Sequence, residues 1–145
     1  MKGVLYTFDE LSVGLSASLS RVITREDITR FAEVTGDRNP IHLDEEFARE
    51  FRIGKKPLGR NIAHGMLSAG MLSAVLGTQL PGPGGVYMSQ TLSFKKPVFI
   101  GDTITAKVEI IDLNPEKHHI RASTVCVNQD EVVVVDGEAL LYFNL

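Results

Sequence analysis

The segment 36–42, GDRNPIH, carries the residue types that acid–base chemistry needs. It places a carboxylate at Asp37 and an imidazole at His42, five positions apart around a proline. A rigid turn can aim two such side chains at one point, which is the arrangement that holds a single water molecule. Histidine changes its protonation state near neutral pH, and a neighbouring carboxylate can orient its ring. Asp37 and His42 are therefore the candidate catalytic pair.

Asn39 is the third polar residue of this segment. It precedes Pro40, so its backbone is biased away from helical geometry, and its side chain can bond its own backbone and fix the turn. We count it as a candidate substrate-binding residue as well as a structural one. Taken singly, Asp37 is typical of a turn or cap and His42 of a half-buried structural histidine. The choice between a structural and a catalytic role for these two residues therefore depends on the surrounding sequence.

Hydrophobic spacing predicts the elements that hold this turn. Residues 14–22 alternate loosely and predict a strand. Thr24, followed by acidic residues, predicts the start of a helix that ends at Gly36. After the ordered turn at 36–43, three acidic residues at 44–46 open a second short helix, and 54–61 reads as a surface loop.

Residues 64–80, HGMLSAGMLSAVLGTQL, form the most informative element. The stretch has no Asp, Glu, Lys or Arg, and its apolar residues cover the whole helical circumference, which predicts a buried helix. At about 17 residues, or roughly 25 Å, it is too short to cross a bilayer. We therefore expect other elements of the chain to wrap this helix.

The second half of the chain supplies that wrapping. The breaker PGPGG at 81–85 is followed by alternating segments with short connections, which predict antiparallel pairing. The strand candidates are 86–94, 102–112, 118–128 and 131–143. The order predicts a single α+β domain over 1–145, with a curved antiparallel sheet around a central buried helix.

Composition excludes several classes of function. Hydrophobic residues make up 43% and charged residues 23% of 145 residues, a balance typical of one globular domain. The net charge of -3 and the lack of a basic face argue against nucleic acid. No stretch approaches the ~20 apolar residues of a membrane span.

Cysteine usage and the N-terminus predict the compartment. The single Cys126 cannot form an intrachain disulfide, and it lies in an alternating apolar run, so we expect a small core residue in a reducing compartment. The N-terminal residues have no apolar signal core and no Arg-rich presequence. We expect a cytoplasmic protein.

Over nearly its whole length the sequence resembles the MaoC-like family of (R)-specific enoyl-CoA hydratases and 3-hydroxyacyl-thioester dehydratases. The resemblance is most specific in 31–101, where the Asp-x-Asn-Pro-x-His pattern at 37–42 is followed by His-Gly-Met at 64–66. It implies a hot-dog fold and a homodimer or dimer of dimers. It also implies an acyl-CoA or acyl-carrier-protein thioester as substrate, with the (R) configuration in the product.

The resemblance also assigns roles to individual residues. Asp37 and His42 match the catalytic pair, Gly65 the oxyanion donor, and Ser73 a polar residue that lines the substrate pocket. His64 also matches the family, and we interpret it as structural. The loop 54–61 is longer than is typical of the family, so we expect the pocket mouth to differ in shape from the family's.

The chemistry is coherent without the family. Addition of water to an enoyl thioester moves negative charge onto the thioester oxygen, so a site needs two proton-handling groups and a donor for that oxygen. Asp37 and His42 supply the first two. The backbone N–H of Gly65 lies at the start of a helix, where amides lack intrahelical partners. No metal or organic cofactor is expected, because His118 and His119 form no ligand set with nearby acids.

Two alternatives remain at this point. One is a thioesterase on the same fold, but such enzymes commonly place a catalytic acid on the central helix, and 64–80 contains none. The other is a non-catalytic acyl-thioester sensor or partner subunit. That alternative would leave the proximity of Asp37 and His42 without a purpose.

Overall fold

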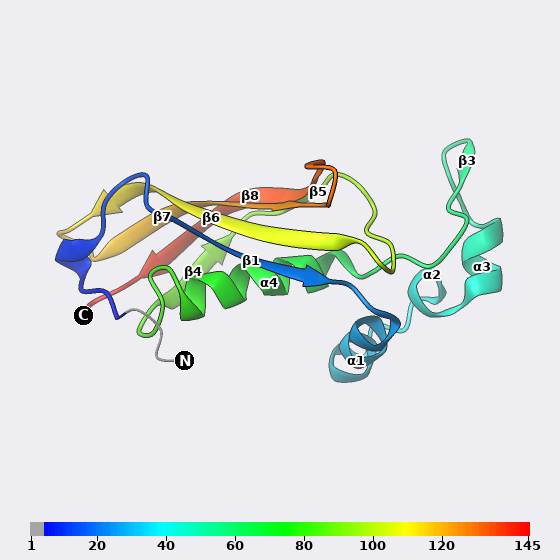
Figure 1. The fold of residues 1–145 in the computed structure, drawn as a ribbon. Helices are drawn as coiled ribbons and strands as arrows, with labels where there is room; N and C mark the ends of the chain where they lie inside the picture. Colours follow the sequence, from blue (N-terminus) through cyan, green and yellow to red (C-terminus); the bar gives the residue numbers. More distant parts are fainter. Residues whose placement is uncertain (1–4) are drawn as a thin grey trace.

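Six strands form one antiparallel sheet that curves over a single long helix in the computed structural model, which describes residues 5–145 (Figure 1). The strand order is β1-β6-β7-β8-β4, and β5 also pairs with β8. The strands of this sheet are β1 (Ser16–Val22), β4 (Val86–Gln90), β5 (Ser93–Phe94), β6 (Thr103–Asn114), β7 (His119–Val127) and β8 (Val133–Tyr142). The predicted α+β architecture and antiparallel pairing are confirmed.

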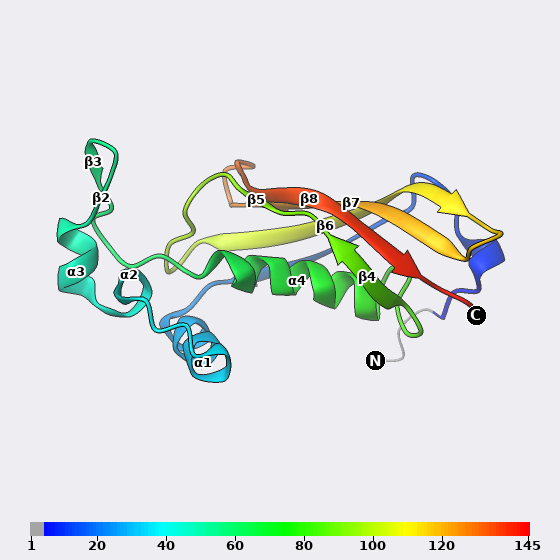
Figure 2. The same cartoon turned by 180° about the vertical axis from the view of Figure 1, so that it is seen from behind.

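The core lies between the sheet and helix α4 (Gly65–Thr78), which packs on β1, β6, β7 and β8 (Figure 2). Strand β6 shows why the sheet buries one face. Its even-numbered positions Ile104, Ala106, Val108 and Ile110 are buried, and the intervening residues are not. Side chains alternate between the two faces of a strand, so this single pattern fixes which face meets the helix.

Helix α4 is not enclosed on every side. Met66, Gly70, Ser73 and Gly77 form an exposed stripe along it. The prediction that the helix is buried all round was wrong for this stripe. Hydropathy ranks glycine and methionine as apolar, but it does not distinguish a side packed into the core from a side that lines an open cavity.

A helical segment between β1 and α4 extends beyond one end of the sheet (Figure 1). It contains α1 (Arg25–Thr35), α2 (Pro40–Leu43), α3 (Glu45–Glu50), and the paired strands β2 (Arg52–Ile53) and β3 (Lys56–Pro57). A further short helix, η1 (Phe8–Glu10), precedes β1. The stretch 54–61, predicted as a surface loop, therefore includes one strand of a short hairpin.

The boundaries of α1 were predicted correctly, and their causes are visible. The Thr24 side chain accepts from the Asp27 amide, and the Asp27 carboxylate accepts from the Thr24 amide, which completes a capping box. Gly36 ends the helix in the left-handed conformation at φ 80°, which glycine adopts without strain. Asp37 therefore follows directly on a fixed helix end.

Two further predictions concern the core and the membrane. Cys126 is buried in the core, as predicted, and burial raises the pKa of its thiol to about 12. Within residues 5–145, the helices are too short or too polar to cross a membrane.

Candidate active site

The turn that carries Asp37 and His42 is held by its own side chains. Asn39 caps α2, and its side-chain oxygen accepts from the Ile41 amide at 3.2 Å. One carboxylate oxygen of Asp37 accepts from the Asn39 amide, also at 3.2 Å. Pro40 occupies the first helical position, where its fixed φ suits the helix. The turn is thus ordered before any ligand binds.

The ring of His42 has one fixed nitrogen and one unengaged nitrogen. Nδ1 lies 2.8 Å from the carbonyl oxygen of Ile62, and the side chain is only 7% exposed. A carbonyl oxygen can only accept, so Nδ1 carries the proton of this bond. In the neutral ring, Nε2 therefore keeps its lone pair. The geometry makes His42 a proton acceptor at Nε2.

His64 lies against His42 and joins the two candidate residues. The two imidazole rings stack with centroids 3.8 Å apart and planes 28° apart. Nε2 of His64 donates to the backbone carbonyl oxygen of Asp37 at 2.9 Å, and Phe31 packs against the same ring with centroids 4.6 Å apart. These contacts fit the structural role predicted for His64, because they fix the position of Asp37 relative to His42.

Burial determines the electrostatics of His42. It is the largest cause of a lowered pKa at His42, and the adjacent His64 lowers it further. The hydrogen bond to the Ile62 carbonyl and the Asp37 carboxylate act in the opposite direction and are outweighed. His42 is therefore held neutral at pH 7, in the form that accepts a proton.

The same three residues are the described group that comes nearest to a metal site. Ligand atoms of Asp37, His42 and His64 lie within 4.8 Å of one another. An imidazole binds a metal along its in-plane lone pair, but the planes of two stacked rings run nearly side by side. One ring would have to turn before both could bind one ion. As it stands, the cluster is suited to a water molecule rather than to a metal ion.

Gly65 begins α4 beside this cluster, so its N–H has no intrahelical partner. A Cβ at this position would lie 2.4 Å from Cδ1 and 2.6 Å from Cε1 of Phe94. Any larger residue would therefore displace the Phe94 ring. In the sequence analysis, Gly65 was assigned only the role of oxyanion donor. The structure adds that it makes room for Phe94.

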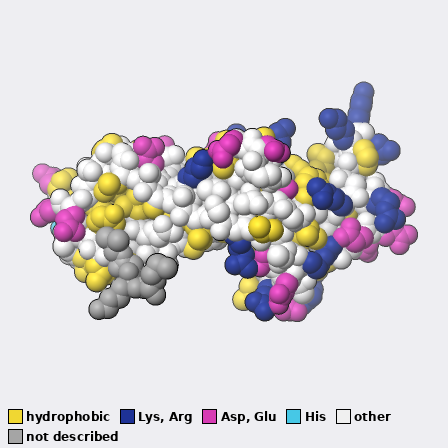
Figure 3. All heavy atoms as spheres, in the orientation of Figure 1, with side chains coloured by type: hydrophobic (Ala, Val, Ile, Leu, Met, Phe, Trp, Pro, Cys, Tyr) yellow, Lys and Arg dark blue, Asp and Glu magenta, His cyan; other side chains and the backbone are white. Residues whose placement is uncertain are grey.

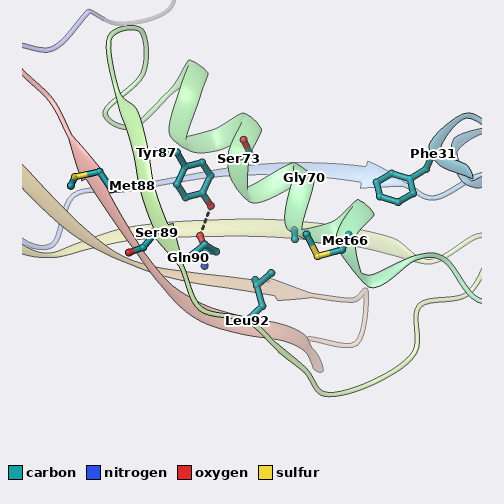
Figure 4. A pocket seen from close by; sticks show the side chains of 10 residues that line it. Phe31, Met66, Gly70, Ser73, Tyr87, Met88, Ser89, Gln90 and Leu92 are labelled. Carbon is teal, nitrogen blue, oxygen red and sulfur yellow. Dashed lines mark hydrogen bonds between the residues drawn. The ribbon is translucent and has the colours of Figure 1, made fainter. Parts of the chain in front are cut away.

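Ser73 faces a cavity of about 440 Å³ between α4 and β4, which we call the apolar cavity (Figure 4). Its lining comes from helices α1 and α4, strand β4 and the segment that follows β4. The lining residues are Phe31, Met66, Ala69, Gly70, Ser73, Tyr87, Met88, Ser89, Gln90 and Leu92. Tyr87 is the only ionisable residue among them, and burial raises its pKa. Asn39 is exposed and lies outside this lining.

Asn61 was not identified from the sequence, although it is the most connected side chain near the site. It is 1% exposed, and its Nδ2 donates to the carbonyl oxygens of Ile41 and Asp44 at 2.9 Å each. The next residue, Ile62, supplies the carbonyl that fixes the His42 ring. Asn61 therefore ties the α2 turn to the segment that enters α4.

Arg25 completes this attachment from α1. Its Nη2 donates to Oδ1 of Asn61 at 3.0 Å and pairs with the Glu45 carboxylate. Its Nη1 donates to the backbone carbonyl of His42 at 3.2 Å. No spacing pattern in one sequence links positions 25, 42 and 61, so these contacts could not have been predicted.

Comparison with known proteins identifies relatives over most of the chain. The family model described as MaoC like domain matches residues 11–134. A 3-hydroxybutyryl-CoA dehydratase of Methylorubrum extorquens is 54% identical over 95% of this chain and 83% of its own length. An (R)-specific enoyl-CoA hydratase of Rhodospirillum rubrum is 46% identical over 94% of this chain and 90% of its own.

A solved structure agrees with these matches. The (R)-hydratase from A. caviae involved in PHA biosynthesis superimposes with a TM-score of 0.85 at 40% sequence identity. The match covers 92% of this chain and 98% of that one.

Replacing Asn61 with leucine should loosen the α2 turn. The change leaves the Ile41 and Asp44 carbonyls and Arg25 without their buried partner, so we expect the free energy of unfolding to fall by about 1–3 kcal/mol. With water admitted to the site, the pKa of His42 should rise toward its ordinary value of 6.5, because burial is the main cause of its depression. Denaturant unfolding and NMR titration of the imidazole measure both effects.

The matched control is Asn144→Leu, at an exposed position near the C-terminus. It should leave both the stability and the His42 titration unchanged. A loss of stability in Asn61→Leu with no change in the His42 titration would mean that Asn61 does not position the site.

Proposed function

From the premise that this chain belongs to the MaoC-like family and is a hydro-lyase of enoyl thioesters, we propose that Asp37 and His42 activate its water. The reaction is the reversible hydration of a trans-2-enoyl thioester to an (R)-3-hydroxyacyl thioester. The observation that carries the assignment is the proximity of the Asp37 carboxylate to a buried His42 ring whose Nε2 is unengaged.

The proposed steps balance around one water molecule. Water donates one hydrogen bond to the Asp37 carboxylate and one to Nε2 of His42, and its oxygen attacks Cβ of the enoyl group. One member of the pair takes the proton as the C–O bond forms, and the electron pair of the C=C bond moves toward the thioester oxygen. The same pair then delivers that proton to Cα. The net result is addition of H and OH, and the reverse sequence is dehydration.

The developing negative charge needs a donor that is in place beforehand. We assign this role to the N–H of Gly65, which lies at the positive end of the α4 dipole. Acid–base assistance contributes about 10²–10⁴ in rate and one oxyanion donor about 10²–10³. Together these correspond to roughly 5–10 kcal/mol of barrier lowering. No cofactor is required for this chemistry.

We place the acyl chain in the apolar cavity. Met66 follows Gly65 directly and lines this cavity, so a thioester held at Gly65 has the cavity beside it. Ser73 contributes a hydroxyl to the wall, as the predicted substrate-binding residue. Asn39, which caps α2 and is exposed, can reach substrate only near the entrance.

We further propose a homodimer that pairs two copies through β4. This strand ends the sheet order, so one of its edges has no partner strand among residues 5–145. Its side chains Val86, Tyr87 and Met88 are 56%, 40% and 51% exposed. Unpaired apolar edges are normally covered. A two-fold pairing would cover this edge and close the apolar cavity, and a dimer of dimers is a further level of the same assembly.

The proposed compartment is the cytoplasm. It is supported by the single cysteine, which is buried and unpaired, as is usual where thiols stay reduced.

Asp37→Asn and His42→Gln should each lower kcat by about 10²–10⁴, because each removes one proton-handling group and leaves a polar side chain of similar size. The measurement is the loss of enoyl absorbance when crotonyl-CoA is added to purified protein. Asp112→Asn and His119→Gln, matched changes on the sheet away from the site, should retain full activity. Near-normal rates in both site variants would refute the catalytic role of Asp37 and His42, and release of free CoA would identify a thioesterase.

The pH dependence of hydration follows from the lowered pKa of His42. The imidazole must be unprotonated to accept the water proton, and a lowered pKa keeps it so as the pH falls through 6.5. We therefore expect kcat/KM for hydration at pH 6.5 to equal its value at neutral pH and to decline only at lower pH. A decline centred above pH 6.5 would contradict the burial argument.

Met88→Asp should weaken the proposed β4 pairing. It would place two like charges near each other at a two-fold contact, at a cost that grows on desolvation. Light scattering should give twice the chain mass for the natural sequence, or four times for a dimer of dimers, and a lower average mass for the variant. A natural protein that is monomeric at micromolar concentration would refute the homodimer.

A further inference from the structure

A second cavity, of about 340 Å³, has Gly65 in its wall, whereas the next residue, Met66, lines the apolar cavity; we call this second cavity the lysine cavity. It reaches the catalytic cluster directly, because His42 forms part of its wall. Its remaining lining combines apolar side chains with two cations. The residues are Ile53, Ile62, Ala63, Gly65, Phe94, Lys95, Lys96, Pro97, Val98 and Val135.

Backbone contacts fix the two lysines at this cavity. The Lys95 amide donates to the Val134 carbonyl at 2.8 Å, and the Lys96 amide approaches the same oxygen at 3.4 Å. Pro97 follows and restricts the backbone of Lys96. Both lysines are exposed, so their ammonium groups extend toward solvent from an anchored base.

The charges of Lys95 and Lys96 are not neutralised by the protein. No Asp or Glu within residues 5–145 forms an ion pair with either lysine. Two other cations between α1 and β5 are engaged elsewhere: Arg60 lies over the Phe99 ring at 4.2 Å, and Arg25 pairs with Glu45. Figure 3 shows Lys and Arg side chains over the β2–β3 hairpin, and acidic side chains mixed with Lys and Arg over the adjoining helices.

The two cavities beside the catalytic cluster thus differ in charge. The apolar cavity has no Lys or Arg in its wall, whereas the lysine cavity has two. An enoyl thioester of CoA or of acyl-carrier protein has the same asymmetry, since its acyl chain is apolar and its pantetheine arm ends in a phosphate. At 340 Å³ the second cavity is at the small end of the range for ligand sites, so it can hold only part of a substrate.

We propose that the lysine cavity receives the carrier arm of the thioester and that Lys95 and Lys96 bind its phosphate at the mouth. The inference rests on the proposed function and adds the direction in which substrate crosses the site. The thioester lies at Gly65, the acyl chain extends past Met66, and the pantetheine arm extends past Phe94. Ile53 of the β2–β3 hairpin lines the lysine cavity, so the hairpin would lie beside the pantetheine arm. This gives the long 54–61 segment a role at the entrance of the cavity.

The test compares three crotonyl thioesters on the full chain: crotonyl-CoA, crotonyl-pantetheine, which has no phosphate, and crotonyl-acyl carrier protein. The variant Lys95→Glu/Lys96→Glu reverses both charges at the mouth. At low salt we expect KM for crotonyl-CoA to rise about tenfold or more with kcat little changed, since each phosphate contact is an exposed ion pair. With crotonyl-pantetheine, kcat/KM should stay at the natural value.

The matched control is Lys117→Glu in the turn between β6 and β7, which should leave kcat and KM for all three substrates unchanged. Equal effects on CoA and carrier protein assign the contact to the phosphate that ends pantetheine. An effect on CoA alone assigns it to the nucleotide phosphates. The proposal is overturned if no substrate responds, if pantetheine responds as strongly as CoA, or if carrier protein alone responds.

This design separates the inference from the function on which it rests. A failed catalytic assignment shows as normal rates in Asp37→Asn and His42→Gln. A failed carrier assignment shows as an active natural enzyme whose KM for crotonyl-CoA does not depend on the charge at positions 95 and 96.

Discussion

The hydrogen bond from Nδ1 of His42 to the Ile62 carbonyl sets the geometry of the whole site. It fixes the ring, determines which nitrogen is left to react, and links the α2 turn to the segment that becomes α4. Asn61 and Arg25 hold the two sides of this link together through the backbone. Because α4 starts three residues after Ile62, the same link also sets the distance between the imidazole and the first amide of the helix.

Burying the polar groups of this link costs free energy, and that cost explains why hydrogen-bond partners surround them. Burying an imidazole, an amide and part of a guanidinium is tolerated only when most of their polar atoms find partners. Here the partners are mainly backbone carbonyls, which cannot take up or release protons. The stacked His64 and the buried surroundings then keep His42 neutral. The interactions that order the site therefore also select the protonation state that the chemistry uses.

The sequence predicted what depends on local or periodic signals. The Thr24–Asp27 cap, the Gly36 stop and the alternation in β6 each act within a few residues, and each was found as predicted. It could not predict contacts between distant positions, such as Asn61 with Arg25 or Gly65 with Phe94. Nor could it predict the exposed stripe of α4, because hydropathy indicates preference for burial and not what is available to cover a surface.

Gly65 lines one cavity and the next residue, Met66, lines the other, which gives the helix start a second role. A backbone amide at this point can hold the thioester oxygen, and side chains on either side then distinguish the ends of the molecule that carries it. Met66 belongs to a wall without Lys or Arg, whereas His42 and Phe94 belong to one that ends in two lysines. Exposed lysines contribute little to stability, so two of them anchored to β8 beside the proposed catalytic histidine are better explained by recognition than by folding. On the mechanism that we propose, the orientation of substrate follows from the asymmetry of the walls, while the proposed chemistry needs only the turn, the imidazole and one amide.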